Sequence, residues 1–276
     1  MTHLSRVVFT VVLCALLSTT ARTTPVWQET AADYQGAAPE QFLARAKVVS
    51  VRPIGTGVTL PMRVTLELDG VTRTAVFKSI DVRKVGIETF ADGTHEANFQ
   101  DSWQTEIAAY RVDRLIGLGL VPATIERRIE GHVGSLQWWV QSMMHEAERV
   151  EKKVAPPDRT VWTHRMMRVR LFDELIANVD RHLNNLLVTA EFELRLIDHS
   201  RSFRLSRDLR KPERLPMFSR TLLQGIRTLT RENVRDATGR YVTSAQINRL
   251  IQRRDAILAL AARLVAERGE AEVLYD

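Results

Sequence analysis

The chain has 276 residues, of which 45% are hydrophobic and 26% charged, so it is long and apolar enough to bury one large core or two lobes. This composition excludes an intrinsically disordered protein. The formal net charge is +6, but the basic residues are scattered rather than gathered into one stripe, so the sequence gives no indication of a nucleic-acid-binding surface.

The N-terminal segment is predicted to lie outside the folded core. Residues 1–24 read as a signal peptide, because Arg6 precedes an apolar run over 7–17 that is too short for a membrane span of about 20 apolar residues. Cys14, the only cysteine, follows a leucine, so neither a lipoprotein signal nor a disulfide in the mature chain is expected. We expect export to the periplasm or the extracellular space, with an uncleaved N-terminal membrane anchor as the alternative and no other membrane contact. Residues 25–40, with two prolines and a glycine, are predicted to be a flexible lead-in.

Three antiparallel strands are predicted to open the folded part. The segments 46–51, 63–68 and 71–78 are β-branched and partly alternating. Asp69-Gly70 joins the last two, and both residue types tolerate the positive φ angles of a tight hairpin turn.

Glycines and a strand lysine in this sheet indicate a nucleotide site. Gly55 and Gly57 lie between the first two strands, where a glycine-rich backbone can approach phosphate oxygens closely. A plain turn is the simpler explanation of the glycines alone. Lys78, preceded by an apolar stretch at the end of the third strand, is placed to contact phosphates, although a solvated lysine at a strand end is the alternative.

A helix is predicted over 102–117, after a polar and mobile loop over 81–101. Glu106 lies in the first turns of this helix. We predict an ion pair between Glu106 and Lys78; the alternative is an acid that interacts with the helix dipole alone and has no partner.

Further strands are predicted at 123–129 and 135–140, and the following residues 141–144 offer backbone groups to an adenine edge. Residues 146–157 are rich in Glu, Lys and Pro and are predicted to be a solvated excursion. An amphipathic helix over 160–177 then leads into the loop that carries the candidate chemistry.

Three polar side chains in and after this loop have the spacing of a phosphoryl-transfer site. Asp180 lies in the loop, Asn185 follows five residues later, and Asp198 ends an apolar strand that pairs with the segment 186–188 in a predicted hairpin. Asp180 is expected to orient the acceptor hydroxyl. Asn185 and Asp198 supply oxygen ligands of the kind that magnesium or manganese prefers.

The neighbours of Asp180 are predicted to support the loop rather than to react. Arg181 is expected to brace it, and His182 is either a satisfied structural histidine or a hydrogen-bond partner of the site. The tail is predicted to be helical over 215–229 and 245–268, with a capping box at 243–246 and no catalytic grouping.

Asp180-Arg181-His182 with Asn185, followed by Asp198, resembles the D-R-H-x-x-N and I-D motifs of the phosphatidylinositol 3- and 4-kinase superfamily. The D-R-H opening and the segment 198–203 are also similar to the secreted protein kinases of the four-jointed and Golgi casein kinase type. The absence of disulfides departs from the disulfide-rich eukaryotic branch and fits a bacterial exported member better.

The resemblance implies an α+β, two-lobed protein-kinase-like fold. The N-lobe, residues 41–140, would hold an antiparallel sheet plus one helix, and the C-lobe, residues 141–276, would be mostly helical. It implies ATP with Mg²⁺ or Mn²⁺ as cofactors, Lys78, Glu106 and the glycines Gly55 and Gly57 as nucleotide-binding residues, and an unidentified hydroxyl acceptor. An exported kinase acting on a protein or small molecule, a lipid kinase, and a catalytically silent nucleotide-binding scaffold remain as alternatives. No basic amphipathic face supports the lipid kinase beyond the resemblance itself.

Overall fold

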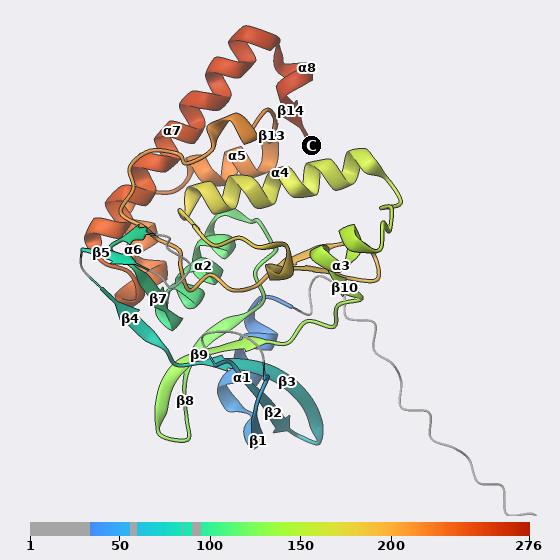
Figure 1. The fold of residues 1–276 in the computed structure, drawn as a ribbon, viewed down its shortest axis with the longest axis vertical. Helices are drawn as coiled ribbons and strands as arrows, with labels where there is room; N and C mark the ends of the chain where they lie inside the picture. The colour runs from blue at the N-terminus through green and yellow to red at the C-terminus, as the bar shows by residue number, and fades with distance from the viewer. Residues whose placement is uncertain (1–33, 56–59, 85, 90–94) are drawn as a thin grey trace, which may run out of the picture.

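The computed structural model describes residues 34–55, 60–84, 86–89 and 95–276 (Figure 1). The predicted signal peptide at 1–24 and most of the predicted lead-in lie outside these residues. None of the described helices is long and apolar enough to cross a membrane.

An antiparallel five-stranded sheet forms the N-terminal part, in the order β1-β2-β3-β9-β8. The strands span Lys47–Pro53 (β1), Met62–Leu68 (β2), Val71–Lys78 (β3), Thr124–Ile129 (β8) and His132–Trp138 (β9). The predicted hairpin at Asp69 and Gly70 is confirmed, because both residues have positive φ angles, 51° and 78°. The register places Lys78, the last residue of β3, opposite Ser135 of β9.

Two helices pack on this sheet. Helix α2, Trp103–Ile116, contacts β8 and β9; it begins at the Ser102 side chain, which accepts the amide of Gln104, and ends at Gly117 in the left-handed conformation. Helix α1, Ala37–Arg45, contacts β8, β9 and β2. It begins inside the range predicted to be a flexible lead-in, so that prediction is wrong from residue 37 onward: the side chain of Leu43 is completely buried, and this burial stabilises the helix.

The segment predicted to be a mobile polar loop over 81–101 contains two short antiparallel ribbons instead. Strand β4, Asp81–Arg83, pairs with β7, Gln100–Ser102, and β5, Ile87–Thr89, pairs with β6, His95–Ala97. Their polar residues show no hydrophobic alternation, and cross-strand backbone hydrogen bonds form the ribbons without it.

The C-terminal part is mostly helical (Figure 1). A small sheet in it has the order β10-β11-β12, and its β11–β12 pairing confirms the predicted hairpin around the candidate site. The α-helices are α3 Glu146–Glu151, α4 Arg159–Leu175, α5 Arg220–Arg227, α6 Arg231–Thr238, α7 Ser244–Arg268 and α8 Glu270–Val273. The strands are β10 Met144–His145, β11 Leu186–Val188, β12 Leu194–Leu196 and the parallel pair β13 Phe218–Ser219 and β14 Leu274–Tyr275. The 3₁₀ segments are Leu183–Asn185, Pro212–Arg214 and Gly239–Tyr241.

Helix α3 corrects a second prediction, because residues 146–157 were expected to be a solvated excursion. The Glu146 side chain is buried and forms a bidentate contact with Arg149, at 2.6 and 2.7 Å, and the Arg149 guanidinium lies over the ring of Trp162. An internal partner thus holds an acid that composition alone assigns to solvent.

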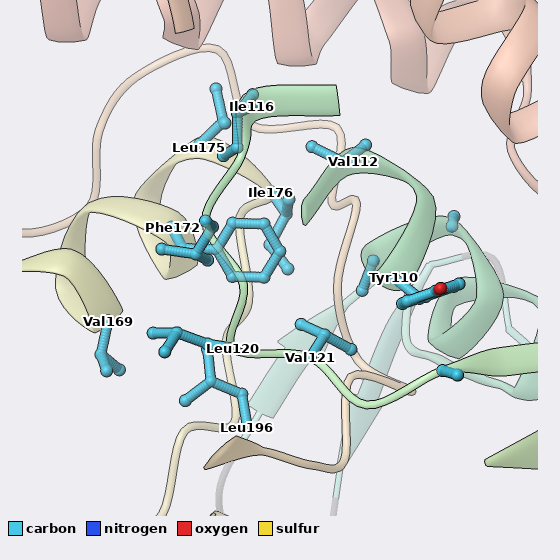
Figure 2. Packing of buried hydrophobic residues seen from close by; sticks show 14 of the residues in the cluster. Tyr110, Val112, Ile116, Leu120, Val121, Val169, Phe172, Leu175, Ile176 and Leu196 are labelled. Carbon is cyan, nitrogen blue, oxygen red and sulfur yellow. The ribbon is translucent and has the colours of Figure 1, made fainter. Parts of the chain in front are cut away.

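One continuous apolar core joins the sheet to the helical part. Figure 2 shows its centre, where Tyr110, Val112 and Ile116 of α2 lie close to Val169, Phe172 and Leu175 of α4, with Leu120 and Leu196 between them. Because this core spans both parts, it fixes the position of the sheet residue Lys78 relative to the loop that follows α4.

Candidate active site

The centre of the site is the ammonium group of Lys78, which contacts two carboxylates. Its Nζ donates to Oε1 of Glu106 at 2.6 Å and to Oδ1 of Asp198 at 2.8 Å. The side chain of Glu106 is only 2% exposed, whereas that of Asp198 is 34% exposed. The predicted ion pair between Lys78 and Glu106 is therefore confirmed, and the same lysine also joins the N-terminal sheet to Asp198.

Electrostatics keep this group of side chains charged. Burial alone lowers the pKa of Lys78, but the charges of Glu106 and Asp198 outweigh it and raise that pKa above its usual value. Burial alone raises the pKa of Glu106, and the opposing effect of Lys78 outweighs it and lowers that pKa. Both shifts favour the charged forms of Lys78 and Glu106 at neutral pH.

The N-terminus of α2 is hydrogen-bonded to the segment that follows Asp198. The amide of His199 donates to the second oxygen of Glu106 at 2.9 Å, and Thr105 Oγ1 donates to the carbonyl oxygens of His199 and Ser200, both at 2.9 Å. The amide of Ser102 donates to the Ser200 carbonyl at 3.0 Å. These contacts hold Glu106 and Asp198 on opposite sides of the same lysine.

Arg181 braces the loop, as predicted. Its guanidinium contacts both carboxylate oxygens of Asp173 at 3.0 Å and donates to the backbone carbonyls of Asn185 at 3.0 Å and Ile197 at 2.7 Å. Contacts to α4, to the loop and to the residue that follows β12 hold its guanidinium in place. Without Arg181, the carbonyls of Asn185 and Ile197 would lose the hydrogen-bond donor that they share.

The Asp180 carboxylate is held through one of its two oxygens. Oδ1 contacts Nε2 of His182 at 2.8 Å and a guanidinium nitrogen of Arg201 at 3.3 Å. The side chain of Asn185 donates to the Asp180 backbone carbonyl at 3.3 Å. His182 is exposed and its contact with Asp180 confirms the predicted role as a hydrogen-bond partner of the site.

A pocket of about 520 Å³ opens beside these residues. Lys78, Asn185 and Asp198 are among its polar lining residues, and Ser142 comes from the segment predicted to meet an adenine edge. The apolar lining includes Trp138, Trp139, Val140, Ile54, Val76, Leu187 and Ile197. An apolar slot that ends in a cation, an amide and a carboxylate suits a flat ring joined to an anionic chain. Asp180 is not among the lining residues, so it approaches from outside the slot.

The predicted metal ligands, Asn185 and Asp198, fit a divalent cation that takes its other ligands from water and from the phosphates of a nucleotide. Asn185 and Asp198 are close in the fold, because the amide of Ile197 donates to the Asn185 carbonyl at 3.2 Å. Within the described residues no group of three or more His, Cys, Asp or Glu side chains is assembled to hold a metal ion alone. One carboxylate and one amide match Mg²⁺, which usually keeps waters and binds one or two protein carboxylates plus substrate phosphates.

The glycine loop is placed only in part. Gly55 has a φ of 79° and follows Ile54, which lines the pocket, but Gly55 itself does not line it. Gly57 lies outside the described residues. Sequence reasoning missed Asp173 and Arg201, and the only signal for Arg201 was its place in the segment that follows Asp198.

The fold is that of a kinase: an antiparallel sheet with a lysine in its third strand, a helix that pairs with this lysine, and a mostly helical C-terminal part. No family model matches the chain, and no curated protein matches it.

Solved structures share this fold. The structure of hydra Fam20 with sugar matches with a TM-score of 0.64 at 14% identity, covering 85% of this chain and 90% of that chain. The Golgi casein kinase with Mn/ADP bound matches with a TM-score of 0.61 at 15% identity, covering 86% of this chain and 77% of that chain. The Helicobacter pylori proinflammatory kinase CtkA matches with a TM-score of 0.51 at 9% identity, covering 81% of this chain and 97% of that chain. The chain therefore has a Fam20-like kinase fold.

Proposed function

We propose that the protein is an ATP- and metal-dependent phosphotransferase that phosphorylates a hydroxyl group on a protein or small molecule. The observation that carries this proposal is the contact of one lysine, Lys78, with Glu106 on one side and Asp198 on the other. Kinases of this fold need these three groups together to hold a nucleotide. The structure of the Golgi casein kinase with Mn/ADP supports the choice of nucleotide and metal.

Each side chain has a distinct task in this proposal. Lys78 binds the nucleotide phosphates, and Glu106 orients its ammonium group. Asn185 and Asp198 would hold Mg²⁺ or Mn²⁺, which neutralises phosphate charge when bound. Since phosphoryl transfer needs little covalent help from the protein, positioning and charge account for most of the expected rate enhancement.

Asp180 receives the acceptor hydroxyl through its second oxygen, Oδ2. Because His182 and Arg201 both contact Oδ1, they fix the rotation of the carboxylate and direct Oδ2 away from themselves. The hydroxyl donates its proton to Oδ2 as the bond to phosphorus forms, and Asp180 holds that proton.

Labelled ATP tests the proposal. Purified protein with γ-labelled ATP and Mn²⁺ or Mg²⁺ should label itself or an acidic carrier protein. Asp198→Ala and Asp180→Ala should each lower this transfer by at least roughly a hundredfold. Asp236→Ala, a change of an exposed acid on α6, is the matched control and should retain full transfer.

Other outcomes identify the alternatives. Labelling of phosphatidylinositol vesicles but of no protein would indicate a lipid kinase. Labelling from α-labelled ATP would indicate transfer of AMP. Nucleotide binding without any transfer, at equal levels in the native protein and Asp180→Ala, would indicate a silent scaffold.

Export through residues 1–24 is a separate part of the proposal. The apolar run over 7–17 supports it. Expression in a bacterial host, followed by fractionation and N-terminal sequencing, should recover a shortened chain from the periplasm. A full-length chain retained in the cytoplasm would contradict this part.

A further inference from the structure

A second pocket, of about 620 Å³, is separate from the nucleotide slot. No residue lines both pockets. Its walls come from four places that are distant in the sequence: the β4–β7 ribbon, Val179 in the loop after α4, the segment 203–210 and the start of α7. Gln246 of α7 joins these walls, because its side-chain nitrogen donates to Gln100 of β7 at 3.1 Å and to the Phe203 carbonyl at 3.0 Å.

The lining of this pocket is apolar in its depth and cationic at its rim. Phe99, Phe203 and Val179 supply apolar surface, and Gln100, Gln246 and Ser206 supply neutral polar groups. Among the lining residues that the structure describes there is no carboxylate, whereas four are basic: Arg83, Lys84, Arg204 and Arg210.

Two of these cations are well placed to bind an anion. The exposed Arg210 guanidinium donates to the Asn178 carbonyl at 3.3 Å, and within the described part of the chain no carboxylate lies within ion-pair distance of it. The exposed Lys84 ammonium is paired with Glu88, and in a solvated position such a pair is weak enough to exchange its partner. An anionic group entering this rim would therefore gain charge-assisted hydrogen bonds at little cost.

The pocket reaches the proposed catalytic loop. Val179 lines it, and the next residue is Asp180, whose Cα is about 3.8 Å further along the chain. Arg201, which lies in the sequence between Asp198 of the nucleotide slot and Phe203 of this pocket, contacts Asp180. A molecule bound here thus lies beside the loop that carries Asp180.

We infer that this pocket is the acceptor site and that it takes a small organic molecule with a hydroxyl, an apolar body and an anionic group, a carboxylate or a phosphate. The anionic group binds Arg210 and Lys84, the apolar body packs on Phe99 and Phe203, and the hydroxyl reaches Asp180. The volume is within the roughly 300–1,000 Å³ typical of small-molecule sites. This inference rests on the proposed phosphotransfer and specifies its acceptor.

The transfer step is balanced. The acceptor oxygen forms a bond to the γ-phosphorus of ATP, the bond from that phosphorus to the bridging oxygen breaks, and ADP leaves with the bond electrons. The hydroxyl proton passes to Asp180. The product carries one more phosphate than the acceptor did.

A binding competition tests the site without any need for turnover. The fluorescent probe anilinonaphthalene sulfonate, an apolar body with one anionic group, is bound to the whole protein in the presence of excess ADP. It is then displaced with para-hydroxymethyl benzoate or with the neutral para-hydroxymethyl benzamide, which differ only in charge. We expect the benzoate to bind at least roughly tenfold more tightly than the amide, the value of one good charge-assisted contact.

Variants decide whether the pocket is responsible. Arg210→Gln and Lys84→Gln should each bring the ratio of the two affinities toward one. Lys152→Gln, at an exposed ion pair on α3 remote from the pocket, should leave the ratio unchanged. A ratio near one in the native protein, or a ratio that neither pocket variant changes, overturns the inference.

Turnover then separates this inference from the proposed function. If self-labelling with ATP occurs, the benzoate should be phosphorylated faster than the benzamide; equal transfer, or transfer to neither, overturns the acceptor role. If self-labelling and all other transfer are absent while binding remains charge-dependent, the proposed function has failed and the anion pocket stands.

Discussion

Replacing Lys78 with methionine tests the central contact of the site. The change keeps most of the side-chain volume and removes the charge that neutralises Glu106. At an effective dielectric constant of about 20, two unit charges separated by 2.6 Å attract by roughly 6 kcal/mol, and desolvation of the two groups offsets much of this. Glu106 is 2% exposed, so without its partner it would be a buried, uncompensated carboxylate.

We therefore expect Lys78→Met to lower the free energy of unfolding by about 3–5 kcal/mol at neutral pH. Asp198 is a third exposed, so the loss of its own contact with Lys78 adds about 1 kcal/mol or less. The double variant Lys78→Met with Glu106→Gln leaves no buried charge and should recover about half of the loss or more.

Urea unfolding of the native protein, the two single variants and the double variant gives the coupling free energy directly. A coupling of about 2 kcal/mol or more is expected. Lys152→Met at an exposed pair is the control, and its unfolding midpoint should not move. If Lys78→Met costs less than about 1 kcal/mol and the effects of the two single changes simply add, the lysine does not hold Glu106 in the way described.

Three further changes test the surroundings of the site. Because Lys78 lowers the pKa of Glu106 below its unfolded value, this pair stabilises the fold above about pH 4.5, and the stabilisation is lost as pH falls below that value. Below that pH, Glu106→Gln should make the decrease of the unfolding free energy with pH shallower by about 1.4 kcal/mol per pH unit. An unchanged slope would contradict this. A Cβ on Gly134 would lie 2.2 Å from the Lys78 carbonyl oxygen, so Gly134→Ala should displace the end of β3 and cost about 1–3 kcal/mol of stability, as measured by urea unfolding. It should also weaken nucleotide binding, as measured by ADP titration. An unaltered ADP affinity would show that a displacement of β3 does not reach Lys78. Arg181→Lys removes the bidentate contact with Asp173 and should lower the rate of phosphate transfer by roughly tenfold or more, with a smaller effect on ADP affinity. An equal loss of transfer and ADP affinity would instead indicate general unfolding of the loop.

Local signals were sufficient for the backbone of the site. The strand ending in Lys78, the helix carrying Glu106 and the hairpin around Asn185 each have a hydrophobic period and a turn or cap residue in the expected place. The order of these elements, with the D-R-H motif, made their convergence predictable before any coordinates were known.

Contacts between distant segments were not predictable in this way. Arg201 lies between Ser200 and Ser202 in the sequence, and only the folded chain places it against Asp180. Helix α3 was missed because composition assigned Glu146 to water, whereas Arg149, which lies over the ring of Trp162, pairs with it. The second pocket takes its walls from residues 83 to 246, and no sequence window contains more than a fraction of them.

The bonds between α2 and the residues after Asp198 also bear on regulation. Four hydrogen bonds connect Ser102, Thr105 and Glu106 to His199 and Ser200, and their backbone partners cannot be removed by substitution of a side chain. An inactive form in which α2 swings outward would have to break all four together with the lysine contact. Such a cost favours a permanently assembled site over one that a switch within the lobe controls.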